Sequence, residues 1–324
     1  MSKAVLTIGG GSGQFVLLSA LRDLSGLSLS AVVSMTDSGG STGRLRDELG
    51  ILPPGDILKC VLALSPHREM ARDLLLKRFS KGVLAGHNAG NMLLSMLGQY
   101  SASFPEGVQA LGEMLDICGE VLPVTIDKST LVAALTNGEL IYGESAIDVP
   151  RGDQREKIEK VFLVPHHSDS VKVYPPVLER INSAEFLIIG PGDLYTSIIS
   201  NLTVPGLCEA IATSKAKLVL VSSLMTKYGE TDGFCLEDFI ATVEGCLGRA
   251  LDCIVFNTHR PSDAQLQGYE CQRAKVVEVK DMAALKNRYE FIGADLIEEG
   301  SGVIRHDIVK LSKVMAELVG VCTQ

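Results

Sequence analysis

Several segments of the sequence combine glycine with hydroxyl or carboxylate side chains in a way that suits phosphate binding. They are residues 9–14, 36–44, 190–197 and 222–232, and residues 86–91 have a similar composition. Glycine lets a backbone come close to a ligand, and consecutive backbone N–H groups can donate hydrogen bonds to phosphate oxygens. These segments predict a site for a phosphorylated, hydroxyl-rich ligand such as a nucleotide or a nucleotide sugar.

Individual residues of these segments have recognisable chemistry. Arg44 can bind a phosphate through two parallel hydrogen bonds. His87 stands just before a helix N-terminus, where it can face an anion. A surface position for Arg44 and a structural role for His87 are the alternatives. The candidate ligand-binding residues are Gly9, Gly10, Gly11, Ser12, Gly13, Asp37, Gly39, Gly40, Ser41, Thr42, Arg44, His87, Asn88, Asn91, Gly190, Gly192, Asp193, Tyr195, Thr196, Ser197 and Thr226.

Four carboxylates, Asp37, Asp193, Glu230 and Asp232, fall in the same segments. Magnesium in a nucleotide site usually takes one or two protein carboxylates together with phosphate oxygens. If magnesium is bound, we expect Asp37 and Asp193 to be its ligands. Solvation of a loop or capping of a helix is the alternative for Asp193 and Asp232. We expect ligand binding to require no cofactor, and we assign no catalytic residue.

Spacing argues against several other chemistries. The eight cysteines occur singly, and no second His or Cys lies three or four residues from His87, which excludes a zinc motif there. We find no Walker A motif, no Ser-His-Asp order and no Cys-His pair. Gln14 stands where the dinucleotide fingerprint has its last glycine, which disfavours an NAD-dependent dehydrogenase.

Three of the glycine-rich segments directly follow apolar runs that are typical of buried parallel strands. These runs are residues 4–8, 29–35 and 186–189, and we expect further strands at 121–125, 218–221 and 253–257, the last of them ending the core. In an open parallel sheet, ligands bind outside the carboxyl ends of the strands, where strand order reverses. We therefore expect the loops to meet at one end of the sheet.

The expected fold class is α/β: a Rossmann-like, mostly parallel sheet flanked by helices, in a single domain spanning 1–324. Asn137-Gly138 is a strong hairpin signal, so we expect a small β-hairpin insertion at about 121–165, in which residues 147–160 are irregular. Helices are expected from the first glycine loop to about residue 24 and at 57–64 with Asp56 as N-cap, 68–79, 106–118, 236–247 and 307–318 with Asp307 as N-cap.

Composition and charge limit the partners. The sequence is 46% hydrophobic with a formal net charge of −9, which is typical of a globular protein and argues against a broad nucleic-acid-binding face. No apolar run is long enough to span a bilayer, and the start has no secretory pattern. We expect a cytoplasmic protein whose cysteines are buried free thiols.

Six stretches resemble the YvcK/CofD-like proteins, a family of gluconeogenesis factors related to 2-phospho-L-lactate transferase. They are IGGGSG (8–13), DSGGSTGRLRDELGILPPGD (37–56), GHNAGNML (86–93), NGELIYGES (137–145), GPGDLYTSI (190–198) and LMTKYGETDG (224–233). The second and fifth stretches are the most specific. The resemblance extends to about residue 257, and we match nothing beyond that point.

The resemblance implies a Rossmann-like, often dimeric, cytoplasmic protein. One branch binds UDP-sugars, notably UDP-N-acetylglucosamine, and is linked to gluconeogenic growth, the cell wall and cell shape. The other transfers a phospholactyl group to a deazaflavin precursor with Mg²⁺. The PPGD and GETDG stretches look more like the first branch. Asp37-Ser38 replaces two adjacent aspartates, which weakens the case for magnesium-dependent transfer. A nucleotide-sugar-binding regulator and a transferase both remain open.

Overall fold

The main sheet lies at the centre of the molecule in the computed structural model, which describes residues 2–150, 152, 155–300 and 302–321. Its seven strands are all parallel, in the order β10-β9-β8-β7-β1-β2-β3. Strand order reverses between β1 and β7, which is where such sheets bind ligands. The strands are β1 (Lys3–Gly9), β2 (Leu27–Val33), β3 (Glu120–Pro123), β7 (Phe186–Ile189), β8 (Lys217–Val221), β9 (Cys253–Asn257) and β10 (Glu290–Ala294).

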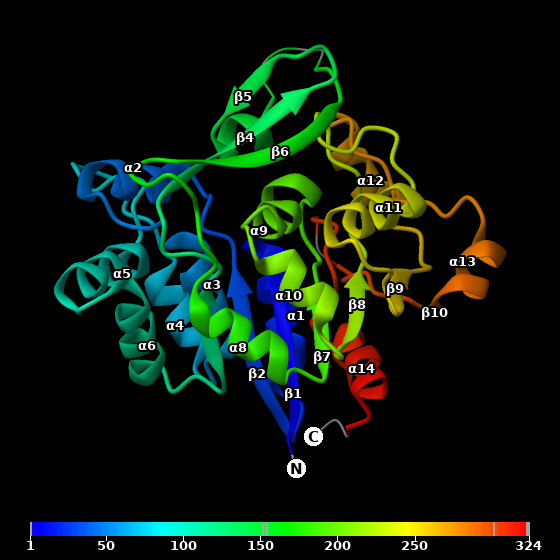
Figure 1. The fold of residues 1–324 in the computed structure, drawn as a ribbon, viewed down its shortest axis with the longest axis horizontal. Coiled ribbons are helices and arrows are strands. Elements are labelled where there is room, and N and C mark those ends of the chain that lie inside the picture. Colours follow the sequence, from blue (N-terminus) through cyan, green and yellow to red (C-terminus); the bar gives the residue numbers. More distant parts are fainter. Residues whose placement is uncertain (1, 151, 153–154, 301, 322–324) are drawn as a thin grey trace.

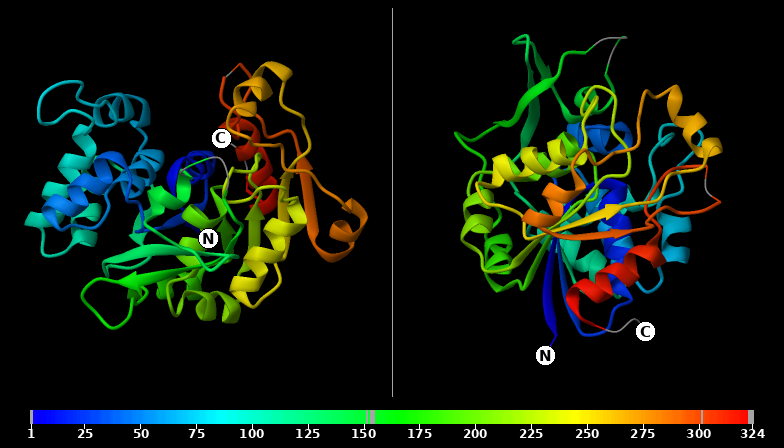
Figure 2. Two further views of the ribbon diagram at one scale, coloured as in Figure 1. Left: turned by 90° about the horizontal axis from the view of Figure 1, so that it is seen from above. Right: turned by 90° about the vertical axis from the view of Figure 1, so that its right-hand side faces the viewer.

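Helices cover both faces of this sheet (Figures 1 and 2). The central strands carry long apolar runs because they are buried on both sides, as at Leu6, Ile8 and Ile188. The helices of one face are α8 (Pro175–Ser183), α10 (Leu207–Thr213) and α11 (Leu236–Leu247). Those of the other face are α1 (Gly11–Arg22), α3 (Gly55–Leu64) and α14 (Ile308–Val319). The α/β fold class is confirmed.

A helical lobe lies beside the β3 edge of the sheet (Figure 1). It contains α2 (Gly40–Leu49), α4 (Arg68–Leu75), α5 (Ala89–Tyr100) and α6 (Phe104–Met114). The π-helix η1 (Leu194–Ile199) and α9 (Ser200–Leu202) follow β7, and α12 (Asp263–Glu270) and α13 (Met282–Arg288) lie near the opposite edge.

A second, antiparallel sheet stands above the carboxyl ends of the main strands (Figure 1). Its order is β5-β4-β6, formed by β5 (Leu140–Tyr142), β4 (Ser129–Leu135) and β6 (Ile158–Pro165). The predicted hairpin is present as the β4–β5 pair. Strand β3 pairs with β2 instead, so the inserted sheet begins at Ser129 and not at about 121. Within residues 147–160, predicted to be irregular, lie the end of α7 (Glu144–Asp148) and the start of β6.

Two predicted helix boundaries are wrong. The helix expected at 68–79 ends at Leu75, because the Phe79 N–H donates to the His87 carbonyl (2.8 Å) and the chain forms a loop over residues 79–87. The helix expected at 106–118 is α6, which spans Phe104–Met114 and so begins and ends earlier than predicted. Its start is fixed by Ser103, whose hydroxyl accepts a hydrogen bond from the Glu106 N–H.

Two further expectations need correction. Asp56 is not an N-cap: it lies inside α3 and pairs with Lys59 at 3.0 Å. Residues 253–257 do not end the core, because β10 pairs in parallel with β9 at the sheet edge. By contrast, Asp307 caps α14 as predicted, accepting a hydrogen bond from the Lys310 N–H.

The cysteines that the structure describes are free thiols, as expected, but only some are buried. Cys60, Cys235 and Cys253 are buried, whereas Cys118, Cys246 and Cys271 are exposed and Cys208 is half-buried. Cys322 lies outside the described residues. None of the helices in the described part of the chain has the length and apolar character needed to cross a bilayer.

Candidate functional site

The loop after β1 and the loop after β7 pack directly on each other. A Cβ atom on Gly13 would lie 2.1 Å from the Pro191 carbonyl oxygen, so only glycine fits there. The Asn201 amide donates hydrogen bonds to the carbonyl oxygens of Gly9 (3.0 Å) and Ser197 (2.8 Å). The first backbone N–H groups of α1 are thus held beside the loop after β7, where strand order reverses.

Asp37, shortly after β2, is one of two neighbouring carboxylates. Its Oδ1 accepts a hydrogen bond from the Gly39 N–H (2.9 Å), and burial together with the negative charge of Asp56 raises the pKa of Asp37. Asp56 Oδ2 would lie 3.0 Å from a Cβ atom on Gly10, and its Oδ1 pairs with Lys59. The loops after β1 and β2 and the start of α3 therefore surround one acidic spot.

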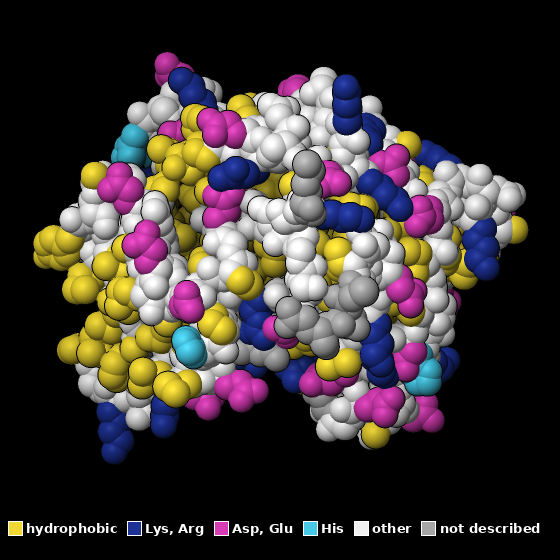
Figure 3. Space-filling view, turned by 90° about the horizontal axis from the view of Figure 1, so that it is seen from below, with side chains coloured by type: hydrophobic (Ala, Val, Ile, Leu, Met, Phe, Trp, Pro, Cys, Tyr) yellow, Lys and Arg dark blue, Asp and Glu magenta, His cyan; other side chains and the backbone are white. Residues whose placement is uncertain are grey.

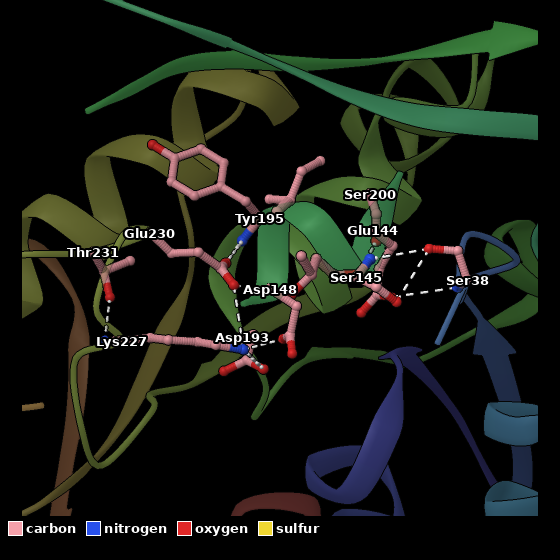
Figure 4. A network of polar contacts seen from close by, with 12 residues as sticks. Ser38, Glu144, Ser145, Asp148, Asp193, Tyr195, Ser200, Lys227, Glu230 and Thr231 are labelled. Atoms are coloured by element: carbon pink, nitrogen blue, oxygen red, sulfur yellow. Dashed lines mark hydrogen bonds and ion pairs between the residues drawn. The ribbon is translucent and has the colours of Figure 1, made fainter. Parts of the chain in front are cut away.

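Helix α7 adds a third carboxylate to this spot, since Glu144 interacts with the charges of Asp37 and Asp56; Figure 4 shows Glu144 beside Ser38. Glu144 Oε2 accepts a hydrogen bond from the Ser38 N–H (3.3 Å), and the Ser145 N–H donates to Ser38 Oγ (3.0 Å). Burial and the charge of Asp37 raise the pKa of Glu144 to about 7. Sequence analysis gave Glu144 no role. The sequence signal for it is a glycine, Gly143, followed by two polar residues. In the structure this glycine has a φ of 93°.

Lys227 is the centre of a second cluster (Figure 4). Its Nζ lies 2.7 Å from Asp193 Oδ2 and 3.4 Å from Glu230 Oε1, and it also pairs with Asp148 at the end of α7. Burial alone would lower the pKa of Lys227, but the three carboxylates outweigh it and raise that pKa. One oxygen of each carboxylate lies within 4.8 Å of the others, a spacing that suits a cation, and Lys227 supplies the positive charge.

Glu230 fixes the loop after β7. Its side chain is fully buried and accepts hydrogen bonds from the Tyr195 N–H (3.1 Å) and the Thr196 hydroxyl (3.2 Å). Burial raises the pKa of Glu230, and the charge of Lys227 opposes that rise. Glu230 therefore positions two of the predicted ligand-binding residues.

His87, Asn91 and Arg44 form a third group, between α2 and α5. His87 is buried, and its Nδ1 shares a hydrogen bond with Ser41 Oγ (2.9 Å), to which Asn91 Nδ2 also donates (3.4 Å). Arg44 Nη2 donates to a carbonyl oxygen of the 79–87 loop (2.8 Å). This group ties α2 to that loop.

Two other predicted residues have partners in the protein itself. Asn88 caps α5, because its Oδ1 accepts a hydrogen bond from the Asn91 N–H (2.7 Å). Thr226 exchanges hydrogen bonds with the backbone of Lys275, at 2.7 Å and 2.9 Å. Asn91 Oδ1 is buried and has no hydrogen-bond partner among the residues that the structure describes.

A hollow of about 570 Å³ lies beside this region, between α2 and the antiparallel sheet. It is lined by Ser38, Arg46, Thr130, Tyr142, Gly143, Ser145, Ala146, Val149 and Pro150. We call the loops 9–13, 36–44 and 190–197 the rim, and α7 with the antiparallel sheet the cover. The hollow lies under the cover and reaches the rim at Ser38.

The structure brings the three rim loops together, as the sequence predicts. The two expected metal ligands fall in different clusters, since Asp37 lies beside Asp56 whereas Asp193 pairs with Lys227. The side chains that sequence analysis did not place in the site are Ser38, Asp56, Lys59, Glu144, Ser145, Asp148 and Lys227.

Comparisons with known proteins found relatives that match nearly the whole chain. The family model described as "2-phospho-L-lactate transferase CofD" matches residues 5–297. Proteins named "Gluconeogenesis factor" from Bacillus subtilis and Halalkalibacterium halodurans are each 35% identical over 97% of this chain, covering 98% and 96% of their own length. These matches reach well past residue 257, where the resemblance in sequence was expected to end.

Solved structures show the same fold. A crystal structure of a Bacillus halodurans protein has a TM-score of 0.90 with 35% identity and covers 97% of this chain and 99% of its own. A second one from that organism, described as a member of the UPF0052 family, has a TM-score of 0.89 with 34% identity and the same coverage.

Proposed function

We propose, from the premise that this chain belongs to the family described as 2-phospho-L-lactate transferase CofD, that it is a regulatory protein that binds a nucleotide sugar. The ligand would be a UDP-sugar such as UDP-N-acetylglucosamine, bound in the cytoplasm. The regulated processes would be growth on gluconeogenic carbon sources and cell-wall morphogenesis. The relatives that this chain matches over nearly their whole length are named gluconeogenesis factor, which supports a function in this area.

Two helix N-termini at the rim give this proposal its main support. α1 and α2 both have glycine as N-cap, at Gly10 and Gly39, and neither has a capping side chain or an acidic residue in its first turn. The first N–H groups of such helices remain free to donate, and the positive end of the helix dipole favours an anion. α1 begins where strand order reverses and α2 follows the neighbouring strand β2, so each of these N-termini suits a phosphate group of a nucleotide sugar.

The hollow under the cover suits the sugar. Hydroxyl groups of Ser38, Ser145 and Thr130 line it, and Arg46 adds a charged donor. Sugars are recognised by hydrogen bonds to their hydroxyl groups, and such bonds discriminate strongly when the partner would otherwise be left unpaired. In this arrangement the rim binds the diphosphate and the cover selects the sugar.

A transferase is the second candidate, and the pair formed by Asp37 and Asp56 favours it. Desolvation and the charge of Asp56 raise the pKa of Asp37, so these two half-buried carboxylates form a pair that the single cation Lys59 only partly neutralises. Two carboxylates with phosphate oxygens suit Mg²⁺, which would supply charge stabilisation of a transferring phosphate group. Asp37 and Asp56 would hold the ion, and Lys227 would keep Asp193 neutralised.

Calorimetry against UDP-N-acetylglucosamine, with and without Mg²⁺, separates the two candidates. The regulator predicts binding that does not need the metal and ligand recovered unchanged after incubation. Consumption of a nucleotide-linked donor only when Mg²⁺ is present would replace the first proposal with the second. Absence of binding to any UDP-sugar under both conditions would reject the regulator.

We also propose that the protein is a homodimer formed through its helical lobe. Large apolar side chains gather on this lobe (Figure 3), and Val83 in the 79–87 loop is 94% exposed. Patches of this kind on a soluble protein mark interaction sites. The exposed side chains are Leu49, Met70, Leu74, Phe79, Val83, Leu84, Met96, Tyr100 and Met114.

Sedimentation velocity tests the dimer. The wild type should sediment as a dimer, and Leu74→Asp should shift it to monomer because the charge would be buried at the interface. Val309→Asp is the matched control: Val309 is similarly exposed, but on α14. A monomeric wild type would contradict the proposed dimer. A Leu74→Asp variant that still dimerises would show that the dimer does not form through the helical lobe.

A further inference from the structure

A second, smaller hollow of about 280 Å³ lies on the other side of Arg46 from the candidate site. It is bounded by the segment between α2 and α3 and by the ends of β4 and β6. Met35, Leu52 and Pro53 give it an apolar floor. The remaining lining residues are Arg46, Asp47, Gly50, Ile51, Lys128, Ser129, His166 and His167.

Cationic and titratable donors from three separate segments converge on this hollow. Arg46 comes from α2, Lys128 precedes β4, and His166 and His167 follow β6. The single carboxylate of the lining, Asp47, is already paired with Arg46 at 2.9 Å. Within the described ranges, no carboxylate pairs with Lys128 or with either histidine. This excess of positive charge occurs in a chain whose formal net charge is −9.

The histidine pair is ordered by the fold. His166 Nε2 shares a hydrogen bond of 2.7 Å with Thr130 Oγ1 on β4, and the two imidazole rings lie edge to face at 6.1 Å. Burial and the charges of Arg46, His167 and Lys128 lower the pKa of His166, and Asp47 opposes them. Positive charges that repel one another in this way would be relieved by an anion placed among them.

We propose that this hollow is an anion-binding subsite for a small phosphorylated molecule, separate from the nucleotide-sugar site. Lys128, His166 and His167 would bind the phosphate, and the apolar floor would contact the carbon skeleton. The volume of about 280 Å³ is just below the usual range for small-molecule pockets, so the hollow suits a small phosphorylated molecule and is too small for a nucleotide sugar. Because Arg46 lines both hollows, occupancy of the subsite would be felt at the candidate site.

Histidine NMR on the full-length protein tests this subsite with two probes at constant ionic strength, inorganic phosphate and phenyl phosphate. The His166 and His167 ring signals are assigned with H166Q and H167Q. Both probes should shift these two signals in a saturable way and raise the apparent pKa of His166, because a bound anion favours the imidazolium. Phenyl phosphate should bind more tightly, because its ring can contact the apolar floor.

Variants locate the binding. Lys128→Ala should weaken phosphate binding, measured on the His166 signal, at least tenfold. Lys160→Ala, which removes an exposed lysine of β6 outside the hollow, should leave it unchanged. Thermal melts establish that each variant is folded. The proposal is overturned if phosphate moves all histidine signals alike, if neither probe moves the His166 and His167 signals, or if Lys128→Ala binds phosphate as wild type does. Any of these results would leave the candidate site at the rim untouched.

Discussion

The rim and the cover are held in place in different ways. The rim is fixed by the close backbone contact of Gly13 with Pro191 and by two buried side chains, Asn201 and Glu230, that bond its loops. The cover touches the rest of the molecule through side chains, among them the link from Ser145 to Ser38 and the ion pair of Asp148 with Lys227. The contacts of the cover are partly exposed and can open by bond rotation, whereas Asn201 and Glu230 are buried and cannot turn away without disrupting the packing around them.

Under the proposed function, this difference divides affinity from selectivity. A preformed rim would bind the diphosphate that UDP-sugars share, without a cost for ordering it. A cover that opens locally would admit the ligand and then contact its variable sugar. Variants of the rim should therefore change stability or overall affinity strongly, and variants of the cover should have smaller effects on opening and pH response.

Gly13→Ala should have the largest effect, because its Cβ atom cannot avoid the Pro191 carbonyl oxygen. We expect the free energy of unfolding to fall by about 3 kcal/mol, the upper end for overpacking, as measured by urea denaturation. Gly245→Ala is the control, since a Cβ atom there meets nothing within 4 Å, and it should change stability by less than about 1 kcal/mol. Equal effects of the two variants would show that the rim is not rigid.

Arg44→Ala should lower the affinity for UDP-N-acetylglucosamine by about 1.5–3 kcal/mol if Arg44 binds phosphate. Arg44 is exposed and bonded to one carbonyl group, so the stability of the unliganded protein should change little. Calorimetry measures the affinity, with Arg260→Ala as an exposed arginine control outside the rim. An unchanged dissociation constant would remove Arg44 from the site.

Glu144→Gln should remove a pH dependence that belongs to the cover. The pKa of Glu144 is raised from 4.5 to about 7 in the folded state. The contribution of the protonated group to stability is therefore fully present below about pH 4.5 and is lost as the pH rises through 7. The variant should be more stable than wild type by roughly 1–2 kcal/mol at pH 8 and by little at pH 5.

Thermal melts at both pH values check this prediction. Glu159→Gln, an exposed glutamate on β6, is the matched control and should behave as wild type at either pH. A Glu144→Gln variant that is no more stable at pH 8 would mean that the cover leaves Glu144 open to water.

Ser38→Ala should have the smallest effect, because Ser38 belongs to the rim but its hydroxyl group bonds Ser145 of the cover. It removes the acceptor of the Ser145 N–H, worth about 0.5–1.5 kcal/mol, and so loosens the first turn of α7. Hydrogen exchange of the α7 amides should become faster by about tenfold while the exchange of β1 stays the same. Ser168→Ala, at an exposed serine, should change neither. If hydrogen exchange becomes faster in β1 as well, the rim and the cover open together as one cooperative unit, which contradicts the prediction.

The rim could be predicted from the sequence because its signals are local. A strand buried on both faces is apolar throughout, as in residues 186–189. The loop that follows it is recognisable by its glycines. The sequence does not predict the edge strand β10, because none of its five residues is buried and they form no such run. Short edge strands give weak patterns.

The cover could not be predicted, because its contacts join residues that are far apart in the chain. Asp148 meets Lys227, 79 positions later, and Glu144 meets Ser38, 106 positions earlier. No periodicity encodes such pairs, and α7 is too short to produce a helical pattern. The sequence predicts only half of the acidic spot: it indicates Asp37 as a site residue, but its pattern predicts Asp56 as a helix cap.

The 79–87 loop joins two surfaces that would otherwise be independent. Arg44 and His87 hold its inner side against α2, and Val83 projects from its outer side into solvent. A phosphate that draws Arg44 away would release the loop carbonyl and so alter the outer surface. Linkage of this kind is reciprocal, so in the proposed dimer a dilution that separates the subunits would also change how firmly each retains the proposed ligand. Ligand occupancy would then depend on both the concentration of the protein and the concentration of its ligand.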